Sequence, residues 1–230
     1  MLTRGHEFSH NYAMSDLIIE SHPFESGMSA KHRQMLEAAA ELFMAHGYGS
    51  VSMDAVARTA GVSKATLYAH FESKERLFAT MVGEVCRRNT AGEGMFPERV
   101  DDVVIVLRAI GGRGLRFLLQ DRTLAIYRMV MAECARFPEL GAAFMANGPQ
   151  GFRDRLQTWL ATQSTSGRLA AGDGRIAAEH FLALIKSGLF MRATLGLPPA
   201  PSDAEIDSTV DAAVDTFMKA FGVKANGLRG

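Results

Sequence analysis

The stretch that decides the fold runs from residue 52 to residue 77 and reads SMDAVARTAGVSKATLYAHFESKERL. It predicts two short helices joined by a tight turn, followed by the start of a third helix. Gly61 can supply the positive φ that such a turn often needs. Ser63 is placed to cap the second helix, because its hydroxyl can accept a hydrogen bond from an unpaired backbone N–H. The apolar residues predicted to hold the pair together are Val56, Val62, Leu67 and Phe71.

The outer face of the second helix carries hydrogen-bonding and mildly basic side chains, as reading a DNA major groove requires. Lys64 can donate to guanine, and the methyl group of Thr66 can contact a thymine methyl. Ala65 is small enough to allow close approach, while Tyr68 and His70 are placed to reach phosphates. The alternative for each residue is a solvated surface side chain.

The stretch resembles the DNA-binding signature of TetR-family transcriptional regulators. The resemblance rests on Val51-Ser52, Val56-Ala57, Ala60-Gly61-Val62-Ser63, Leu67-Tyr68-Ala69-His70-Phe71 and Ser73-Lys74-Glu75-Arg76-Leu77. It implies that Tyr68 and Lys74 clamp the DNA backbone and that Ser52 is a third anchor. The region from Arg122 to Phe221, above all residues 132–140, is also similar to the C-terminal domain of the AefR-like branch. That similarity implies regulation by an effector without identifying it.

Apolar spacing predicts helices almost throughout and no strand, so the fold class is all-α. A three-helix helix-turn-helix DNA-binding domain at residues 29–76 precedes a larger helical domain for effector binding and dimerisation at residues 77–230. Residues 1–28 are predicted as a flexible arm, or alternatively as an arm that enters the minor groove. The Gly111–Gly114 stretch is expected to bend or weaken its helix. Besides the two helices of the quoted stretch, we expect helices over about 30–46, 73–90, 98–119, 122–136, 140–164 (interrupted near Gly148-Pro149), 174–195 and 203–222, nine in all.

Composition narrows the possible functions. Twenty-five basic and twenty-five acidic residues leave no net charge, so the chain is not a general polyanion binder and any DNA affinity must come from local placement. No signal-peptide pattern or apolar run of the ~20 residues a membrane span needs occurs, which predicts a soluble, cytoplasmic protein. No cofactor is expected. No metal is expected either, because Cys86 and Cys134 lack metal-ligand spacing; both cysteines are expected to be buried, with redox sensing as the alternative.

Catalysis is not expected either. The best candidates for catalytic residues are His180 near Asp173, Arg175 and Glu179, or the histidines of the arm. No nucleophile elbow, phosphate loop or paired carboxylate of fitting context accompanies these residues.

The last two predicted helices carry the apolar residues expected to join two copies of the chain. In TetR relatives these helices usually form a four-helix dimer interface, so the resemblance implies a homodimer. The alternative is that the same side chains are buried in the core of one chain. The residues predicted at the interface are Leu184, Ile185, Leu189, Val210, Val214 and Phe217.

The middle helices are expected to bind a small, mostly apolar effector. The predicted lining is Phe117, Tyr127, Met131, Phe152, Trp159 and Phe181, with Arg113, Arg128 and His180 as polar anchors; plain core packing is the alternative. One helix-turn-helix reads too few base pairs to be selective, so a dimer on a palindromic operator is expected. The predicted function is therefore a repressor that its effector releases from DNA, or alternatively a DNA-binding regulator controlled by a protein partner.

Overall fold

The computed structural model describes residues 29–90 and 95–223, so the arm predicted for residues 1–28 lies outside the described residues. Within the described ranges there are eleven helices and no strand, and an isolated bridge joins Leu169 to Gly222. The all-α prediction is confirmed. The helices are α1 (Ala30–His46), α2 (Met53–Thr59), α3 (Lys64–His70), α4 (Lys74–Thr90), α5 (Val103–Leu118), α6 (Asp121–Glu133), α7 (Pro138–Asn147), α8 (Pro149–Thr165), α9 (Arg175–Ile185), α10 (Gly188–Thr194) and α11 (Asp203–Phe221).

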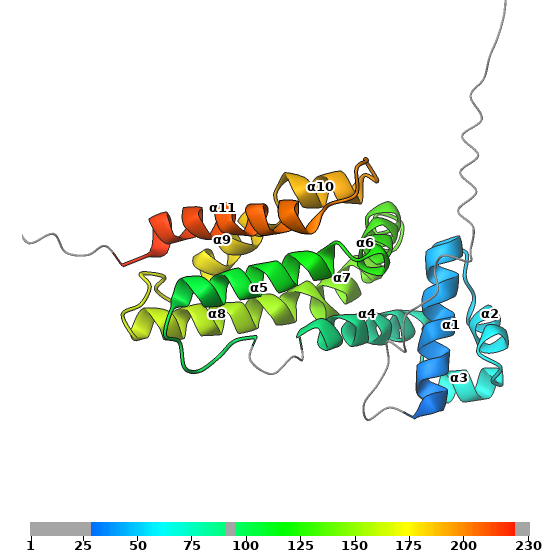
Figure 1. Ribbon diagram of the computed structural model, residues 1–230. Helices are drawn as coiled ribbons and strands as arrows, with labels where there is room; N and C mark the ends of the chain where they lie inside the picture. Colours follow the sequence, from blue (N-terminus) through cyan, green and yellow to red (C-terminus); the bar gives the residue numbers. More distant parts are fainter. Residues whose placement is uncertain (1–28, 91–94, 224–230) are drawn as a thin grey trace, which may run out of the picture.

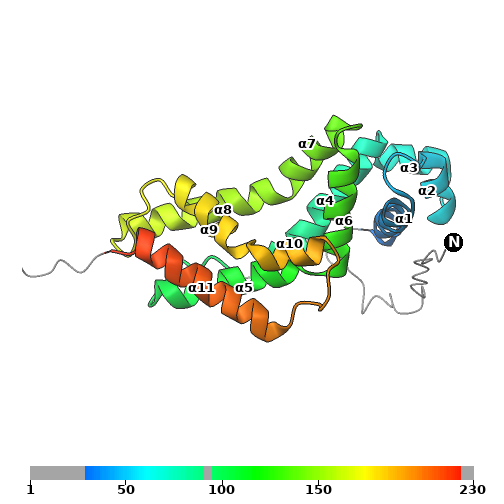
Figure 2. The same ribbon diagram turned by 90° about the horizontal axis from the view of Figure 1, so that it is seen from above.

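The helices form a small head and a larger body. Both views show α1, α2 and α3 gathered at one end, with α4 reaching from them to the body (Figure 1, Figure 2). In the body, α11 lies against α5 and α9, and α8 lies against α7 and α9. Because α4 contacts both α1 and α7, it connects the two parts. No helix in the described ranges combines the length and apolarity needed to cross a membrane.

Two apolar cores correspond to this arrangement. The first centres on Phe43, Tyr48 and Phe78 and joins α1–α4 to residues of α6 and α7, among them Ile126 and Leu140. The second joins α5, α8, α9 and α11 around side chains such as Leu107 and Phe217. The boundary predicted between residues 76 and 77 falls inside α4, whose apolar side chains belong to the first core.

The helix boundaries follow local signals at most positions. Ser52 and Ser63 cap α2 and α3, and their hydroxyls accept from Ala55 N at 3.1 Å and Thr66 N at 3.0 Å. The expected interruption near Gly148-Pro149 is confirmed, since α7 ends at Asn147 and α8 begins at Pro149. The single helix expected over 174–195 is wrong. The chain leaves the helical conformation at Ser187 (φ −40°, ψ −152°), so α9 and α10 are separate helices.

Gly111 permits close packing inside α5. The glycines expected to bend or weaken this helix lie within one continuous helix from Val103 to Leu118. A Cβ at Gly111 would stand 2.8 Å from Ile185 Cδ1 and 3.2 Å from Val210 Cγ1. The missing side chain therefore leaves the space in which α9 and α11 meet α5.

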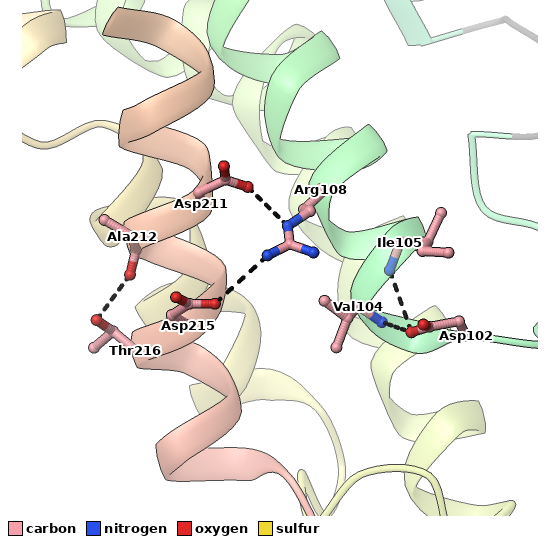
Figure 3. A network of polar contacts seen from close by, with 8 residues as sticks. All are labelled: Asp102, Val104, Ile105, Arg108, Asp211, Ala212, Asp215 and Thr216. Carbon is pink, nitrogen blue, oxygen red and sulfur yellow. Dashed lines mark hydrogen bonds and ion pairs between the residues drawn. The ribbon is translucent and has the colours of Figure 1, made fainter.

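Ion pairs run along the outer edge of the contact between α5 and α11. Arg108 Nε donates to Asp211 Oδ1 at 2.7 Å, and its Nη2 lies 3.7 Å from Asp215 Oδ1 (Figure 3). Arg116 makes the equivalent contacts with Asp203 and Asp207, at 3.2 and 2.7 Å. Exposed pairs of this kind contribute roughly 0–1 kcal/mol each, so we assign them to the orientation of the two helices more than to stability.

The start of α11 makes stability depend on pH. Glu205 and Ser202 form a reciprocal capping box, and Arg192 Nη2 donates to Glu205 Oε1 at 2.7 Å. Hydrogen bonds from the Ser202 backbone and from the Arg192 and Ser202 side chains lower the pKa of Glu205 from its ordinary 4.5 to about 2. A carboxylate with a lowered pKa stabilises the fold above its ordinary pKa, and that stabilisation is lost as pH falls from about 4.5 to about 2.

We therefore expect Glu205→Gln to be less stable than the wild type at neutral pH, and the gap to close by pH 2. Urea unfolding of both proteins at a series of pH values measures the difference, and subtraction cancels the titration of the other acidic groups. A gap that stays constant from pH 6 to pH 2 would contradict the assignment.

Candidate functional site

Helix α3 packs against the head with one face and exposes the other to solvent. Leu67 is fully buried and anchors the helix to the head. Lys64 and Ala65 are exposed, and Tyr68 is 40 % exposed. Thr66 is half-buried, and its Oγ1 lies 2.7 Å from the capping hydroxyl of Ser63. The structure thus brings five predicted DNA-contacting residues onto one short helix.

Lys64 is paired with a carboxylate of the preceding helix. Its Nζ lies 2.8 Å from Asp54 Oδ1, with both side chains more than half exposed. The hydrogen bond to Asp54 is the main cause that raises the pKa of Lys64. Solvent screens an exposed pair of this kind and leaves it weak, so Lys64 can exchange Asp54 for another acceptor at little cost.

His70, the last residue of α3, packs against α1. Its ring centroid is 5.5 Å from that of His32, which in turn lies 4.7 Å from the Phe71 ring. Burial, and then the neighbouring His70, lower the pKa of His32. His70 itself stays exposed, so it can also face a ligand outside the head.

Lys74 is largely engaged within the protein. Its Nζ donates to the carbonyls of Tyr48 and Val51 at 2.9 and 3.0 Å and lies 4.3 Å from the Tyr48 ring centroid. Burial lowers the pKa of this ammonium group. Two of its three donor protons therefore connect α4 to the α1–α2 loop, and these two bonds leave the third proton unused. Ser52 follows that loop and is exposed while it caps α2.

The end of α6 and the start of α7 contact the same loop. Glu133 and Phe137 pack against Gly49 and Tyr48. Glu133 Oε2 accepts from Gly49 N at 2.6 Å, and the Phe137 and Tyr48 ring centroids are 5.4 Å apart. A Cβ at Gly49 would come within 2.8 Å of the Phe137 ring, so the approach is close. Sequence reasoning gave these residues no role, although Glu133 and Phe137 lie in the stretch that carried the AefR-like resemblance.

The body contains an apolar cavity of about 340 Å³ walled by residues of helices α4 to α10. Four of the six predicted effector-binding residues line it, and so does the predicted anchor Arg113; the four are Phe117, Tyr127, Phe152 and Phe181. Sequence reasoning missed several others, among them Val82 and Cys86 of α4, Phe144, Lys186 and Phe190. Burial raises the pKa of the Cys86 thiol to about 11, so this thiol stays protonated at neutral pH.

The remaining predicted pocket residues lie elsewhere. Met131 is 60 % exposed, and Trp159 is buried in the second core with its Nε1 donating to Pro97 O at 3.0 Å. Arg128 donates to the carbonyls of Ala193 and Thr194. His180 lies on the surface beside the Phe221 ring. Apolar character alone did not distinguish the cavity from the neighbouring core.

The residues around His180 that were considered as catalytic candidates make structural contacts. Asp173 accepts from the backbone N–H of Arg175 at 3.0 Å, and the Arg175 guanidinium lies 3.5 Å from the Glu179 carboxylate. His180 turns toward Phe221. These contacts stabilise the start of α9 and do not join a nucleophile to a base.

The side chains predicted at the dimer interface face the interior of a single chain. Leu184 is half-buried, and the other five are buried: Ile185, Leu189, Val210, Val214 and Phe217. A side chain already buried in one chain offers no surface to a second. Contact between copies through these helices would have to use other faces, where Ile176 of α9 and Met191 of α10 are exposed apolar residues; Leu195 and Leu197, also exposed, follow the end of α10.

Comparison with known proteins extends the early resemblance to most of the chain. The family model of bacterial regulatory proteins of the tetR family matches residues 35–81, and that of the AefR-like transcriptional repressor C-terminal domain matches residues 105–223. A solved TetR-family regulator from Mesorhizobium loti is 27% identical at a TM-score of 0.74, over 86% of this chain and 100% of that one.

Two further relatives differ in how much of the chain they match. The solved Flavonoid-responsive Regulator FrrA is 32% identical at a TM-score of 0.74, over 85% of this chain and 98% of that one. The HTH-type transcriptional activator FasR from Mycolicibacterium smegmatis is 47% identical over 49 residues, which are 21% of this chain and 22% of that protein. The second match is therefore confined to a short segment.

Proposed function

Because the chain belongs to the TetR family of bacterial regulatory proteins, with an AefR-like C-terminal domain, we propose that it is a repressor released from a palindromic operator by a small, mostly apolar effector. TetR-family regulators bind DNA and function as dimers, and this chain is a DNA-binding transcriptional regulator, not an enzyme. One observation carries the effector half of the proposal. The apolar cavity is walled by α4 and α6, the same two helices that hold the α1–α2 loop of the head.

In this proposal residues 29–76 read DNA, while residues 77–230 bind the effector and form the dimer. Lys64 leaves Asp54 and donates to a base edge, and Thr66 contacts a thymine methyl. Tyr68 and His70 reach phosphates. Ser52, together with the remaining proton of Lys74, anchors the same backbone, which sets the register of the base contacts. Ser63 and Ala65, the other two residues predicted at the DNA interface, form the start of the recognition helix.

Effector binding reaches the head along two routes. Val82 and Cys86 of α4 line the cavity, and α4 begins at Lys74, which holds the α1–α2 loop. Tyr127 of α6 also lines the cavity, and α6 ends at Glu133, which holds Gly49. A molecule that separates these walls displaces both attachments and changes the distance between the two heads of the dimer. A differential affinity of ~1–3 kcal/mol between the two arrangements is sufficient.

The cavity favours a planar aromatic effector. Its volume of about 340 Å³ lies at the small end of the ~300–1,000 Å³ of ligand pockets, and aromatic rings make up much of its wall. FrrA, similar to this chain over most of its length, is by name flavonoid-responsive. We therefore propose an effector of flavonoid size that binds among Phe117, Tyr127, Phe152 and Phe181.

Fluorescence anisotropy with labelled DNA from upstream of the protein's own gene tests this function. We expect saturable binding that prefers the upstream fragment over a scrambled one and weakens with salt. Naringenin, a flavonoid, should raise the Kd for the upstream fragment by roughly 5–150-fold.

Equal and feeble binding to both DNAs, at low salt and at high salt, would contradict the proposal of a repressor acting at that site. Specific binding that no apolar aromatic compound changes would favour the alternative, a regulator controlled by a protein partner. Tighter binding in the presence of the compound would instead indicate that the ligand promotes DNA binding, which contradicts release by the effector.

A further inference from the structure

The wall of the apolar cavity is positively charged. Among the described residues that line it are Arg87, Arg113, Arg155 and Lys186, and no aspartate or glutamate. Two of these cations are engaged locally. Arg87 donates to both carboxylate oxygens of Glu84, at 2.6 and 2.9 Å, and the Arg155 guanidinium lies 5.0 Å from the Phe96 ring centroid. The charge available to a ligand is therefore that of Arg113 and Lys186.

Lys186 follows the last residue of α9 and borders both the cavity and solvent. Within the described ranges no carboxylate lies within ion-pair distance of it. The charged group that does influence it is another cation, Arg153, and burial together with this neighbour lowers the pKa of Lys186. An ammonium group in partly apolar surroundings beside a like charge is stabilised by an anion brought into the cavity.

Arg113 lies on the adjoining part of the wall. Two residues before it, Gly111 meets Ile185, the residue before Lys186, at 2.8 Å from an ideal Cβ to Cδ1. The end of α9 and the middle of α5 therefore adjoin at this part of the cavity. Arg113 is exposed and has no ion pair among the described residues, so its guanidinium is also available.

A neutral hydroxyl lies beside the cavity on α6. Thr123 lines it, and the Oγ1 atom of Thr123 is buried without a hydrogen-bond partner in the described structure. A buried hydroxyl without a partner gains a hydrogen bond when its side chain turns toward an acceptor on a ligand.

We propose that the effector is an apolar, aromatic molecule with one anionic group, such as a carboxylate or sulfonate, which Lys186 binds with the help of Arg113. The aromatic body lies among the phenylalanine rings, and Thr123 donates to a further oxygen. The inference rests on the proposed function in one respect, namely that this cavity is the effector site. It adds that charge, as well as shape, selects the ligand.

A matched pair of fluorescent probes tests the charge requirement. 8-Anilinonaphthalene-1-sulfonate and N-phenyl-1-naphthylamine share one aromatic frame, and only the first is an anion; both brighten in apolar surroundings. We expect the full chain to bind the anionic probe about 10-fold more tightly, which corresponds to about 1.4 kcal/mol. Lys186→Met should abolish this preference and leave the Kd of the neutral probe unchanged. Lys186→Arg should retain it.

Two further variants control for charge and for location. Lys219→Met removes an equivalent charge from the exposed face of α11 and should change neither Kd. Gly114→Leu places a side chain at the cavity wall, where a Cβ meets nothing within 4 Å, and should weaken the binding of both probes.

The outcomes separate the two proposals. Suppose that both probes bind with equal Kd, that Gly114→Leu weakens both and that Lys186→Met changes neither. The anion requirement is then overturned, and the cavity remains a binding site. If neither probe shows saturable binding that Gly114→Leu weakens, the cavity is not a ligand site, which overturns both the effector half of the proposed function and this inference.

Discussion

Replacing Gly174 by alanine is expected to destabilise the protein by about 2–5 kcal/mol. Gly174 precedes α9 with φ +77° and ψ −12°, in the left-handed region that residues with a Cβ rarely adopt. A Cβ here would also overlap the carbonyl oxygen of Gln157 and come 3.0 Å from the backbone nitrogen of Ala161, both on α8. Neither backbone atom can rotate away as a side chain would, so α8 and α9 have to separate.

Gly172 provides the matched control. It also has a positive φ, +57°, but a Cβ there meets nothing within 4 Å. Gly172→Ala should therefore show the conformational strain alone, about 1–2 kcal/mol. Urea unfolding followed by circular dichroism, at one protein concentration for all variants because dimerisation contributes to apparent stability, measures both. Equal stability of the two variants would refute the backbone overlap.

Tyr68→Ala is expected to reduce operator affinity by about 100-fold or more. A hydrogen bond to a charged group such as a phosphate contributes about 1.5–3 kcal/mol, and a dimer loses one such bond at each half-site. Tyr68 is 40 % exposed, whereas the adjacent Leu67 is fully buried, so removal of the ring should leave the head folded. An unchanged thermal midpoint by circular dichroism checks this point.

The Tyr68→Phe variant removes the hydroxyl and keeps the ring, so it separates the contribution of the hydroxyl to DNA affinity from that of the ring. The ring centroid also lies 5.9 Å from Lys64 Nζ, so the alanine variant changes the surroundings of a base-reading residue as well. If the hydroxyl contacts phosphate, anisotropy should show both variants weakened on operator and scrambled DNA alike. A phenylalanine variant with wild-type affinity would remove Tyr68 from the phosphate contacts.

The head was predictable from sequence because its determinants are local. Gly61 takes φ +60° at the turn, Ser63 caps α3, and Leu67 is buried three residues after the first residue of that helix. Each feature depends on residues within a few positions of it. The cap of α2 at Ser52 follows the same rule.

The contacts between head and body were not predictable in this way. Glu133 and Gly49 are 84 residues apart, and nothing in the composition of either segment indicates the other. Trp159 and Phe152 were both predicted to line the pocket, but apolar character does not distinguish a residue that fills the core from one that borders a cavity. The same limit applies to Val214: an apolar stripe indicates burial without showing whether the chain's own core or a second copy covers it.

The arginine–aspartate pairs between α5 and α11 bear on the register in which the two helices pack. The four aspartates recur every fourth residue, so a shift of α11 by four residues, about 6 Å, would restore all but one of the pairings. In one direction the shift would bring Lys219 to Arg108, where like charges repel. In the other it would bring Ile206 to Gly111, where Val210 already fits closely. The ion pairs alone therefore do not fix the register of α11 on α5. The register depends on charge repulsion against a shift in one direction and on steric overlap against a shift in the other.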